Sequence, residues 1–173
     1  MNRCILLFPE FSNMSVIDSI RQKYDPAYSL VPPHVTLVFP FESDLADKEI
    51  REHMRNSLAG QEPFLLSLQG ISSQKSFGNY LLLNVHTGKN TVKDIHRRLY
   101  TGILEQYKPL WCRTFEPHMT VGKVDTEAEL HSALDELSGV EDCFEVCIRS
   151  IHVEIIGGDG SSIIESVLEL PVL

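Results

Sequence analysis

The sequence has no long apolar run in its 173 residues. No stretch approaches the roughly 18–20 consecutive apolar residues that a membrane-spanning helix requires, so the sequence predicts no membrane partner. The first residues, Met1 to Phe8, enter Pro9-Glu10 without the small-residue cleavage site of a secretory signal. They are typical of a first β-strand, and we expect the protein to stay in the cytoplasm.

Positive charge is also scarce. The chain holds 15 Lys and Arg against 24 Asp and Glu, which gives a formal net charge of −9 and a pI near 5.2. Non-specific binding to long nucleic acid depends on many phosphate contacts from Lys and Arg, so this composition argues against it. A small nucleotide, or an RNA terminus held in a locally electropositive pocket, remains a suitable substrate.

Cysteine pairs at ligand spacing are absent. The four cysteines are Cys4, Cys112, Cys143 and Cys147, with no CxxC and none near a histidine pair at zinc-finger spacing. Free cysteine commonly packs as a small hydrophobic residue, so we expect buried, reduced thiols.

Strand and helix patterns alternate along the whole chain. Helical spacing and caps predict helices at about 13–24, 44–59, 91–106 and 126–137. Apolar or alternating runs predict strands at 2–8, 34–39, 64–68, 80–85, 113–121, 143–156 and 163–170, with 28–33 extended because of its prolines. This order indicates an α+β fold with helices packed on mixed or antiparallel sheets.

One short pattern occurs twice. Pro33-His34-Val35-Thr36-Leu37 and Pro117-His118-Met119-Thr120-Val121 both read Pro-His-apolar-Thr-apolar, and they begin 84 positions apart, about half the chain. Such spacing suggests a duplicated lobe. Side chains alternate faces along a strand, so each motif would direct its His-Thr pair to a cleft and its apolar residues to a core.

Two facing imidazoles suit phosphoryl chemistry. The ordinary pKa of histidine is about 6.5, so near neutral pH one ring can act as a base while the other acts as an acid. His34 and His118 are therefore the candidate catalytic residues, and sequence leaves open which is acid and which is base. The hydroxyls of Thr36 and Thr120 are candidate donors to the phosphate oxygens, where negative charge gathers.

Two other readings of the histidine pair are possible. Structural zinc usually takes four ligands, and the two motif strands carry no Asp, Glu or Cys at ligand spacing, so we expect neither metal nor cofactor. A non-catalytic module that keeps the cleft and binds phosphorylated nucleotides or RNA ends is the main alternative to an enzyme. The oligomeric state leaves no trace in the sequence.

Five further residues are candidate substrate contacts. Lys75, Phe77 and Tyr80 lie in or beside the polar stretch 72–79, which could form a lid with an aromatic face for a base. Arg113 and Lys123 lie five residues before and after His118. On a regular strand both would point away from the cleft, unless the strand bulges at Gly122. Phe39 is expected in the core, and Trp111 could either cover a ligand or seal a helix end.

The paired motifs resemble those of the 2H phosphoesterase superfamily, whose bacterial members are often called 2′-5′ RNA ligase-like proteins. The similarity extends over essentially the whole chain. It implies an α+β fold of two pseudo-twofold-related lobes, each a mainly antiparallel sheet with outer helices, around a central cleft. Residues 1–173 would then form a single domain of two interwoven lobes, each supplying one His-x-Thr motif.

The resemblance also implies an activity. Family members are cyclic phosphodiesterases acting on 2′,3′-cyclic phosphates, some with reversible 2′-5′ RNA ligation. The family's histidines correspond to His34 and His118, and its threonines to Thr36 and Thr120. We therefore expect a metal-independent phosphoesterase for cyclic or 2′-5′-linked nucleotide phosphodiesters.

Overall fold

A computed structural model describes residues 1–112 and 114–172 of the chain. Eight strands form one sheet in the order β6-β3-β4-β5-β2-β1-β7-β8, and neighbouring strands pair antiparallel. The strands are β1 (Asn2–Leu7), β2 (Val35–Glu42), β3 (Phe64–Gln74), β4 (Asn79–Val85), β5 (His118–Val124), β6 (Phe144–Ile148), β7 (Ser150–Ile156) and β8 (Ser162–Glu169).

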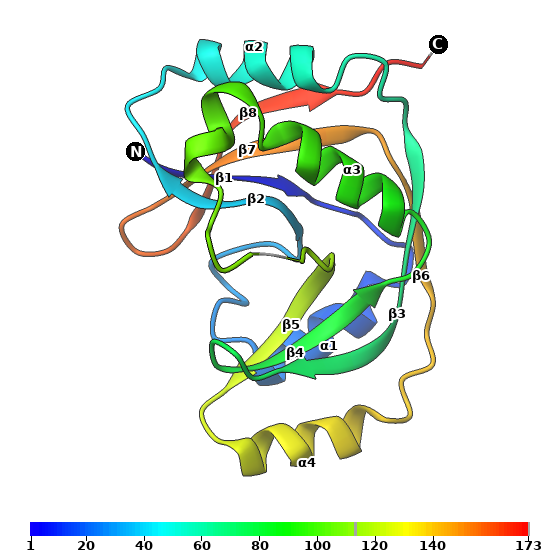
Figure 1. The fold of residues 1–173 in the computed structure, drawn as a ribbon. Helices are drawn as coiled ribbons and strands as arrows, with labels where there is room; N and C mark the ends of the chain where they lie inside the picture. Colours follow the sequence, from blue (N-terminus) through cyan, green and yellow to red (C-terminus); the bar gives the residue numbers. More distant parts are fainter. Residues whose placement is uncertain (113, 173) are drawn as a thin grey trace.

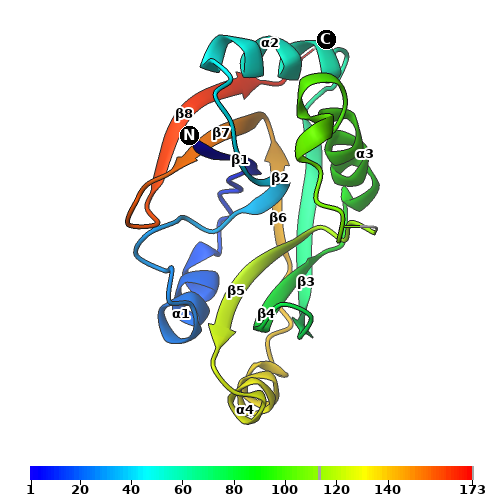
Figure 2. The same cartoon turned by 60° about the vertical axis from the view of Figure 1, so that its left-hand side comes forward.

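Helices cover the sheet at both ends (Figures 1 and 2). They are α1 (Met14–Tyr24), α2 (Asp47–Ser57), α3 (Lys89–Leu99), the 3₁₀ helix η1 (Gly102–Tyr107) and α4 (Glu127–Leu137). In both views α2 and α3 lie at the end that holds β1, β7 and β8, whereas α1 and α4 lie at the opposite end. None of the helices in the described residues is long and apolar enough to cross a bilayer.

The sheet divides into two halves of four strands each. We call β2-β1-β7-β8 the first half-sheet and β5-β4-β3-β6 the second half-sheet. They meet where β2 lies beside β5. Helix α1, which precedes β2 in the chain, packs against β5, and α3, which precedes β5, packs against β2. Each half thus covers the central strand of the other, and this exchange confirms the expected α+β fold of two pseudo-twofold-related lobes.

The hydrophobic core lies between the sheet and the helices. Val35 and Leu37 of β2, and Met119 and Val121 of β5, are all 0% exposed. Burying each such side chain contributes roughly 1.5–3 kcal/mol. Because side chains alternate along a strand, the His and Thr of each motif face away from this core, as the sequence pattern predicts.

Local backbone preferences shift two predicted elements. The expected helix 91–106 ends at Leu99 and continues as η1, because Thr101 is extended and Gly102 has φ of +51°. The segment predicted to be extended, 28–33, begins instead with turns: the amides of Tyr28 and Leu30 donate to the carbonyls of Asp25 and Ala27, both at 3.0 Å. Proline constrains mainly the residue before it, so it extends only the end of this segment.

Two strand predictions are also corrected. The run 143–156 is not one strand: β6 pairs with β3 in the second half-sheet, whereas β7 pairs with β1 in the first. The chain crosses between the halves near Arg149, where only the polar pair Arg149-Ser150 interrupts the strand-like pattern. Cys143 and Cys147 are exposed rather than buried, while Cys4 and Cys112 are buried as expected. The β5 ladder begins only at His118, because Pro117 has no amide hydrogen to donate.

Candidate active site

The two motif strands meet at a single residue pair. Val35 of β2 faces Met119 of β5, the one pairing recorded between these strands in the described chain. Extending that register by one residue on either side sets His34 opposite Thr120 and Thr36 opposite His118. In this register the two histidines stand diagonally across the strand pair, on the same face. The repeat therefore converges on one site drawn from both halves of the sheet.

The two imidazoles are held in the same way. Nδ1 of His34 lies 2.9 Å from the Pro32 carbonyl oxygen, and Nδ1 of His118 lies 2.8 Å from the Glu116 carbonyl oxygen. A carbonyl can only accept, so Nδ1–H donates in both rings. In each motif a proline separates the histidine from the residue that accepts. Each ring consequently keeps Nε2 for a ligand.

Burial lowers the pKa of both histidines. For His34 the hydrogen bond to Pro32 and the carboxylate of Glu154 oppose this shift. For His118 the bond to Glu116 opposes it, while the charge of His34 lowers the pKa further. Both imidazoles are thus mainly neutral at pH 7 and can accept a proton at Nε2.

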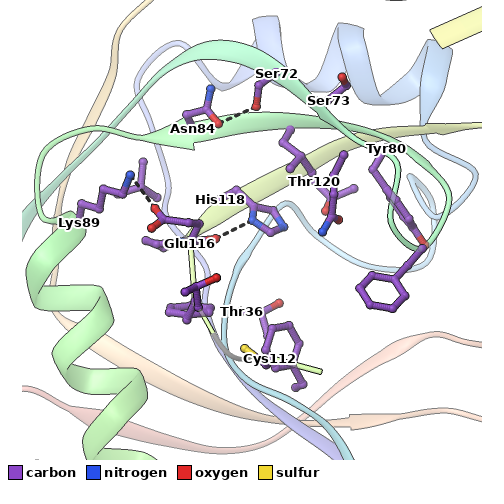
Figure 3. A pocket seen from close by; sticks show the side chains of 18 of the residues that line it. Thr36, Ser72, Ser73, Tyr80, Asn84, Lys89, Cys112, Glu116, His118 and Thr120 are labelled. Carbon is purple, nitrogen blue, oxygen red and sulfur yellow. Dashed lines mark hydrogen bonds and ion pairs between the residues drawn. The ribbon is translucent and has the colours of Figure 1, made fainter. Parts of the chain in front are cut away.

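A pocket of about 640 Å³ opens beside this strand pair. Thr36, His118 and Thr120 contribute to its wall, and Figure 3 shows their side chains directed toward the same space. His34 is not among its lining residues; its ring packs edge-on against Phe8, with centroids 6.1 Å apart. The pocket is therefore built mainly from the second half-sheet, and His34 lies just before β2, outside the pocket lining.

One wall of the pocket carries polar residues of β3 and β4, of which Asn84 was not singled out from the sequence. Asn84 pairs with His118 in the β4–β5 ladder. Its side-chain oxygen accepts from the Ser72 hydroxyl at 2.8 Å, and its amide donates to the Gly70 carbonyl at 2.9 Å. Ser72 and Asn84 both line the pocket. Ser72 belongs to the polar stretch 72–79, whose first residues continue β3, whereas a polar residue within a strand such as Asn84 usually marks only a solvent-facing side.

Aromatic side chains border the pocket mouth. Trp111 and Phe77 are 54% and 59% exposed, and their ring centroids lie 5.0 Å apart. Phe39 completes the cluster at 4.9 Å from Trp111. Phe39 packs against the core, as expected, but it is only half-buried and also lines the pocket. Large exposed aromatic faces at a pocket can stack on planar ligands.

A bulge decides the position of Lys123. Leu82 pairs with Thr120, but Leu81 pairs with Gly122, so β5 holds an extra residue at this point. The bulge reverses the alternation and brings Lys123 level with Tyr80, whose ring lies 5.5 Å from the ammonium. Tyr80 lines the pocket; Lys123 is not among its lining residues and reaches it only through its contact with Tyr80. The strand therefore does bulge at Gly122, which is the condition under which Lys123 could face the cleft.

The remaining predicted contacts divide into three cases. Phe77 lines the pocket, as predicted for a substrate contact. Lys75 is not among the lining residues, and its ammonium instead pairs with Glu127 of α4. Because that partner holds it at the outer surface, the structure gives Lys75 no place at the pocket. Arg113 lies outside the described residues.

Glu116 links His118 to two lysines. Its carboxylate lies 2.7 Å from Nζ of Lys89 and 2.5 Å from Nζ of Lys93, both on α3. Figure 3 shows Glu116 with its carboxylate toward Lys89 and its carbonyl toward His118. These ion pairs hold the pKa of Glu116 below its usual value. Within residues 1–112 and 114–172, no group of three or more His, Cys, Asp or Glu side chains gathers as a metal site.

The α+β fold, one eight-stranded antiparallel sheet with helices packed on it, is that of the 2H phosphoesterase class. The chain belongs to the 2′-5′ RNA ligase superfamily, whose family model matches residues 8–160.

Relatives of similar length support this assignment. A Bacillus licheniformis protein named "Putative phosphoesterase" is 30% identical over 152 residues, which cover 86% of each chain. A protein of the same description from Geobacillus sp. strain WCH70 is 32% identical over 150 residues, covering 86% of this chain and 84% of the relative.

Solved structures share the fold at low sequence identity. The protein TT0787 of Thermus thermophilus superposes with a TM-score of 0.70 at 13% identity, covering 98% of both chains. LigT of E. coli in complex with 3′-AMP superposes with a TM-score of 0.66 at 14% identity, covering 98% of this chain and 97% of LigT.

Proposed function

We propose that the protein is a metal-independent phosphoesterase that hydrolyses cyclic or 2′-5′-linked nucleotide phosphodiesters by two-histidine acid–base catalysis. One observation carries this proposal. His34 and His118 donate Nδ1–H to equivalent carbonyls, at 2.9 and 2.8 Å, from strands that meet at Val35 and Met119. Both Nε2 atoms are thereby left to act on one phosphate group.

For a 2′,3′-cyclic phosphate the reaction needs two proton transfers. The neutral histidine accepts a proton from water at Nε2 as the water oxygen bonds to phosphorus. The bond from phosphorus to one ribose oxygen breaks, and the protonated histidine donates its Nε2 proton to that oxygen. The product is a nucleoside monophosphate, and exchange with solvent restores the initial protonation states. A 5′-hydroxyl in place of water would give a 2′-5′ linkage, so the same site could also perform RNA ligation.

Two sets of side chains would assist this chemistry. Thr36 and Thr120 flank the histidines and can donate to the non-bridging oxygens, where negative charge grows in the transition state. Phe77 and Tyr80 line the pocket and offer faces for a base, with Lys123 beside them as a cation. The LigT complex with 3′-AMP supports a small nucleotide as ligand. We further infer that residues 1–173 work as one domain whose interwoven lobes each supply one motif.

A product screen in EDTA tests the proposal. Purified protein is incubated with 2′,3′-cyclic mononucleotides, cyclic-phosphate-ended oligonucleotides and 2′-5′ dinucleotides, and products are separated by chromatography. Changing either His34 or His118 to Ala should lower kcat by about 10²–10⁴-fold. His131→Ala is the matched control, because His131 is exposed on α4. Turnover that survives in the double variant would exclude the mechanism, and binding without product would indicate a nucleotide-binding module instead.

A further inference from the structure

A second, smaller cavity of about 290 Å³ adjoins the pocket. Cys112, Thr114, Phe115 and Glu116 line both, so the two spaces share a wall. The side chains that line only the smaller cavity are Lys93, His96 and Lys108. Two of these are cations, in a chain whose net charge is −9. The smaller cavity therefore concentrates positive charge next to the histidine pair.

One carboxylate serves two of the neighbouring lysines. Glu116 bridges Lys89 and Lys93 at 2.7 and 2.5 Å, and these side chains are 44% and 35% exposed. Lys108 adds a third cation at the same wall. Lys89 and Lys93 share the single carboxylate of Glu116, and with Lys108 lining the cavity the local charge is net positive. An anion that replaced the Glu116 carboxylate would meet donors that are already in place.

The floor of the cavity is rigid. His96 of α3 stacks on Phe115 with ring centroids 3.7 Å apart and an interplanar angle of 2°. Its Nδ1 donates to the Leu37 carbonyl oxygen at 2.7 Å, which ties α3 to β2. Burial lowers the pKa of His96, the hydrogen bond to Leu37 raises it, and the charge of Lys108, which lines the same cavity, lowers it further. Lys93 and Lys108 therefore line a cavity whose His96 and Phe115 rings are held by stacking and by the hydrogen bond to Leu37.

We propose that the smaller cavity is an anion subsite in which Lys93 and Lys108 bind a second phosphate group of the substrate, with Glu116 as the competing internal anion. This inference rests on the proposed function, because it assumes that the first phosphate reacts between His34 and His118. The second phosphate would displace the Glu116 carboxylate from Lys93. The preferred substrate therefore carries two phosphate groups, either on a short oligonucleotide or on a nucleotide with an additional phosphate.

Three substrates with the same reacting group distinguish these sources. They are adenosine 2′,3′-cyclic phosphate, the same compound with a 5′-phosphate, and an adenosine dinucleotide ending in the cyclic phosphate. For the full-length protein, kcat/KM should be higher for at least one of the two-phosphate substrates than for the one-phosphate substrate. A preference for the dinucleotide alone identifies a backbone phosphate, and a preference for the 5′-phosphate compound identifies a terminal one.

Two kinds of variant should change the preference for two-phosphate substrates in opposite directions. Lys93→Gln and Lys108→Gln should each reduce the two-phosphate preference up to about fivefold, the effect of losing one partly exposed ion pair. Glu116→Gln removes the competing anion and should increase the preference by a similar factor. Lys48→Gln is the matched control, because Lys48 is exposed on α2 and should leave the preference unchanged.

Equal changes for one- and two-phosphate substrates, or no change with either lysine variant, would overturn the subsite. If wild-type protein turns over none of the three compounds, the proposed function fails separately. Calorimetry then decides the subsite by comparing adenosine 3′,5′-bisphosphate with 3′-AMP. Tighter binding of the bisphosphate that Lys93→Gln abolishes supports the subsite, whereas equal binding of the two ligands overturns it.

Discussion

The pH dependence of turnover follows from the environment of the two imidazoles. Catalysis needs one protonated and one neutral histidine, so activity tracks the singly protonated pair. Burial lowers the pKa of both His34 and His118, and the charge of His34 lowers that of His118 further. Both apparent pKa values should therefore lie below the ordinary histidine value of about 6.5. At neutral pH most of the free enzyme should be in the unproductive, doubly neutral form.

The size of the effect follows from mass action. Above the higher apparent pKa, the singly protonated fraction falls about tenfold for each pH unit, so kcat/KM should drop about tenfold between pH 7.5 and 8.5. Below the lower pKa both rings are protonated, and activity should fall again. The assay measures kcat/KM for adenosine 2′,3′-cyclic phosphate at constant ionic strength, with His131→Ala as control. A profile that is flat or rises from neutral to alkaline pH would refute this reasoning.

Other expected outcomes concern binding, catalysis and stability. Thr36→Val and Thr120→Val should each lower kcat by about 10²-fold with the fold retained, and unchanged kcat would remove these hydroxyls from the mechanism. Trp111→Ala should raise KM about tenfold through loss of stacking, and an unchanged KM would argue against a base at this face. Because Trp111 is the only tryptophan of the chain, nucleotide binding should also quench the fluorescence of the wild-type protein. In Gly122→Ala the new Cβ would lie 2.7 Å from Cβ of Tyr24, so the free energy of unfolding in urea should fall by about 1–3 kcal/mol, and an unaltered midpoint would contradict that packing. Folding lowers the pKa of four histidines: His34, His96, His118 and His152. Stability that is present above the unfolded pKa of about 6.5 is therefore lost as the pH falls through the folded pKa values. The Tm should decrease from pH 7 to pH 5, and an increase would contradict these shifts.

Strand alternation is the part of the site that sequence predicts well. Val35 and Met119 are fully buried, so the neighbouring His and Thr of each motif must face the other side of the sheet. This local rule holds wherever the strand is regular. At Gly122 it fails, because one extra residue reverses the side on which Lys123 lies. Gly122 itself was the only sign of the bulge in the sequence. Tyr24 and Leu81 pack closely against it, so a Cβ at this position would clash with them.

Long-range pairing is the part that sequence could not supply. Ser72 and Asn84 reach the pocket because β3 and β4 pair beside β5, and nothing near either residue encodes that arrangement. The same applies to Glu116 and the lysines of α3, which meet only through the tertiary fold. The division of 143–156 between the two half-sheets likewise depends on partners far away in the chain.

A crystal structure of the protein with a nucleotide–vanadate complex would measure the central geometry directly. The Nε2 atoms of His34 and His118 should each lie about 3 Å from an oxygen of the vanadate, on opposite sides of the metal centre that stands in for phosphorus. Thr36 and Thr120 should contact the remaining oxygens. A vanadate held by one histidine alone, or bound away from the β2–β5 strand pair, would contradict the account.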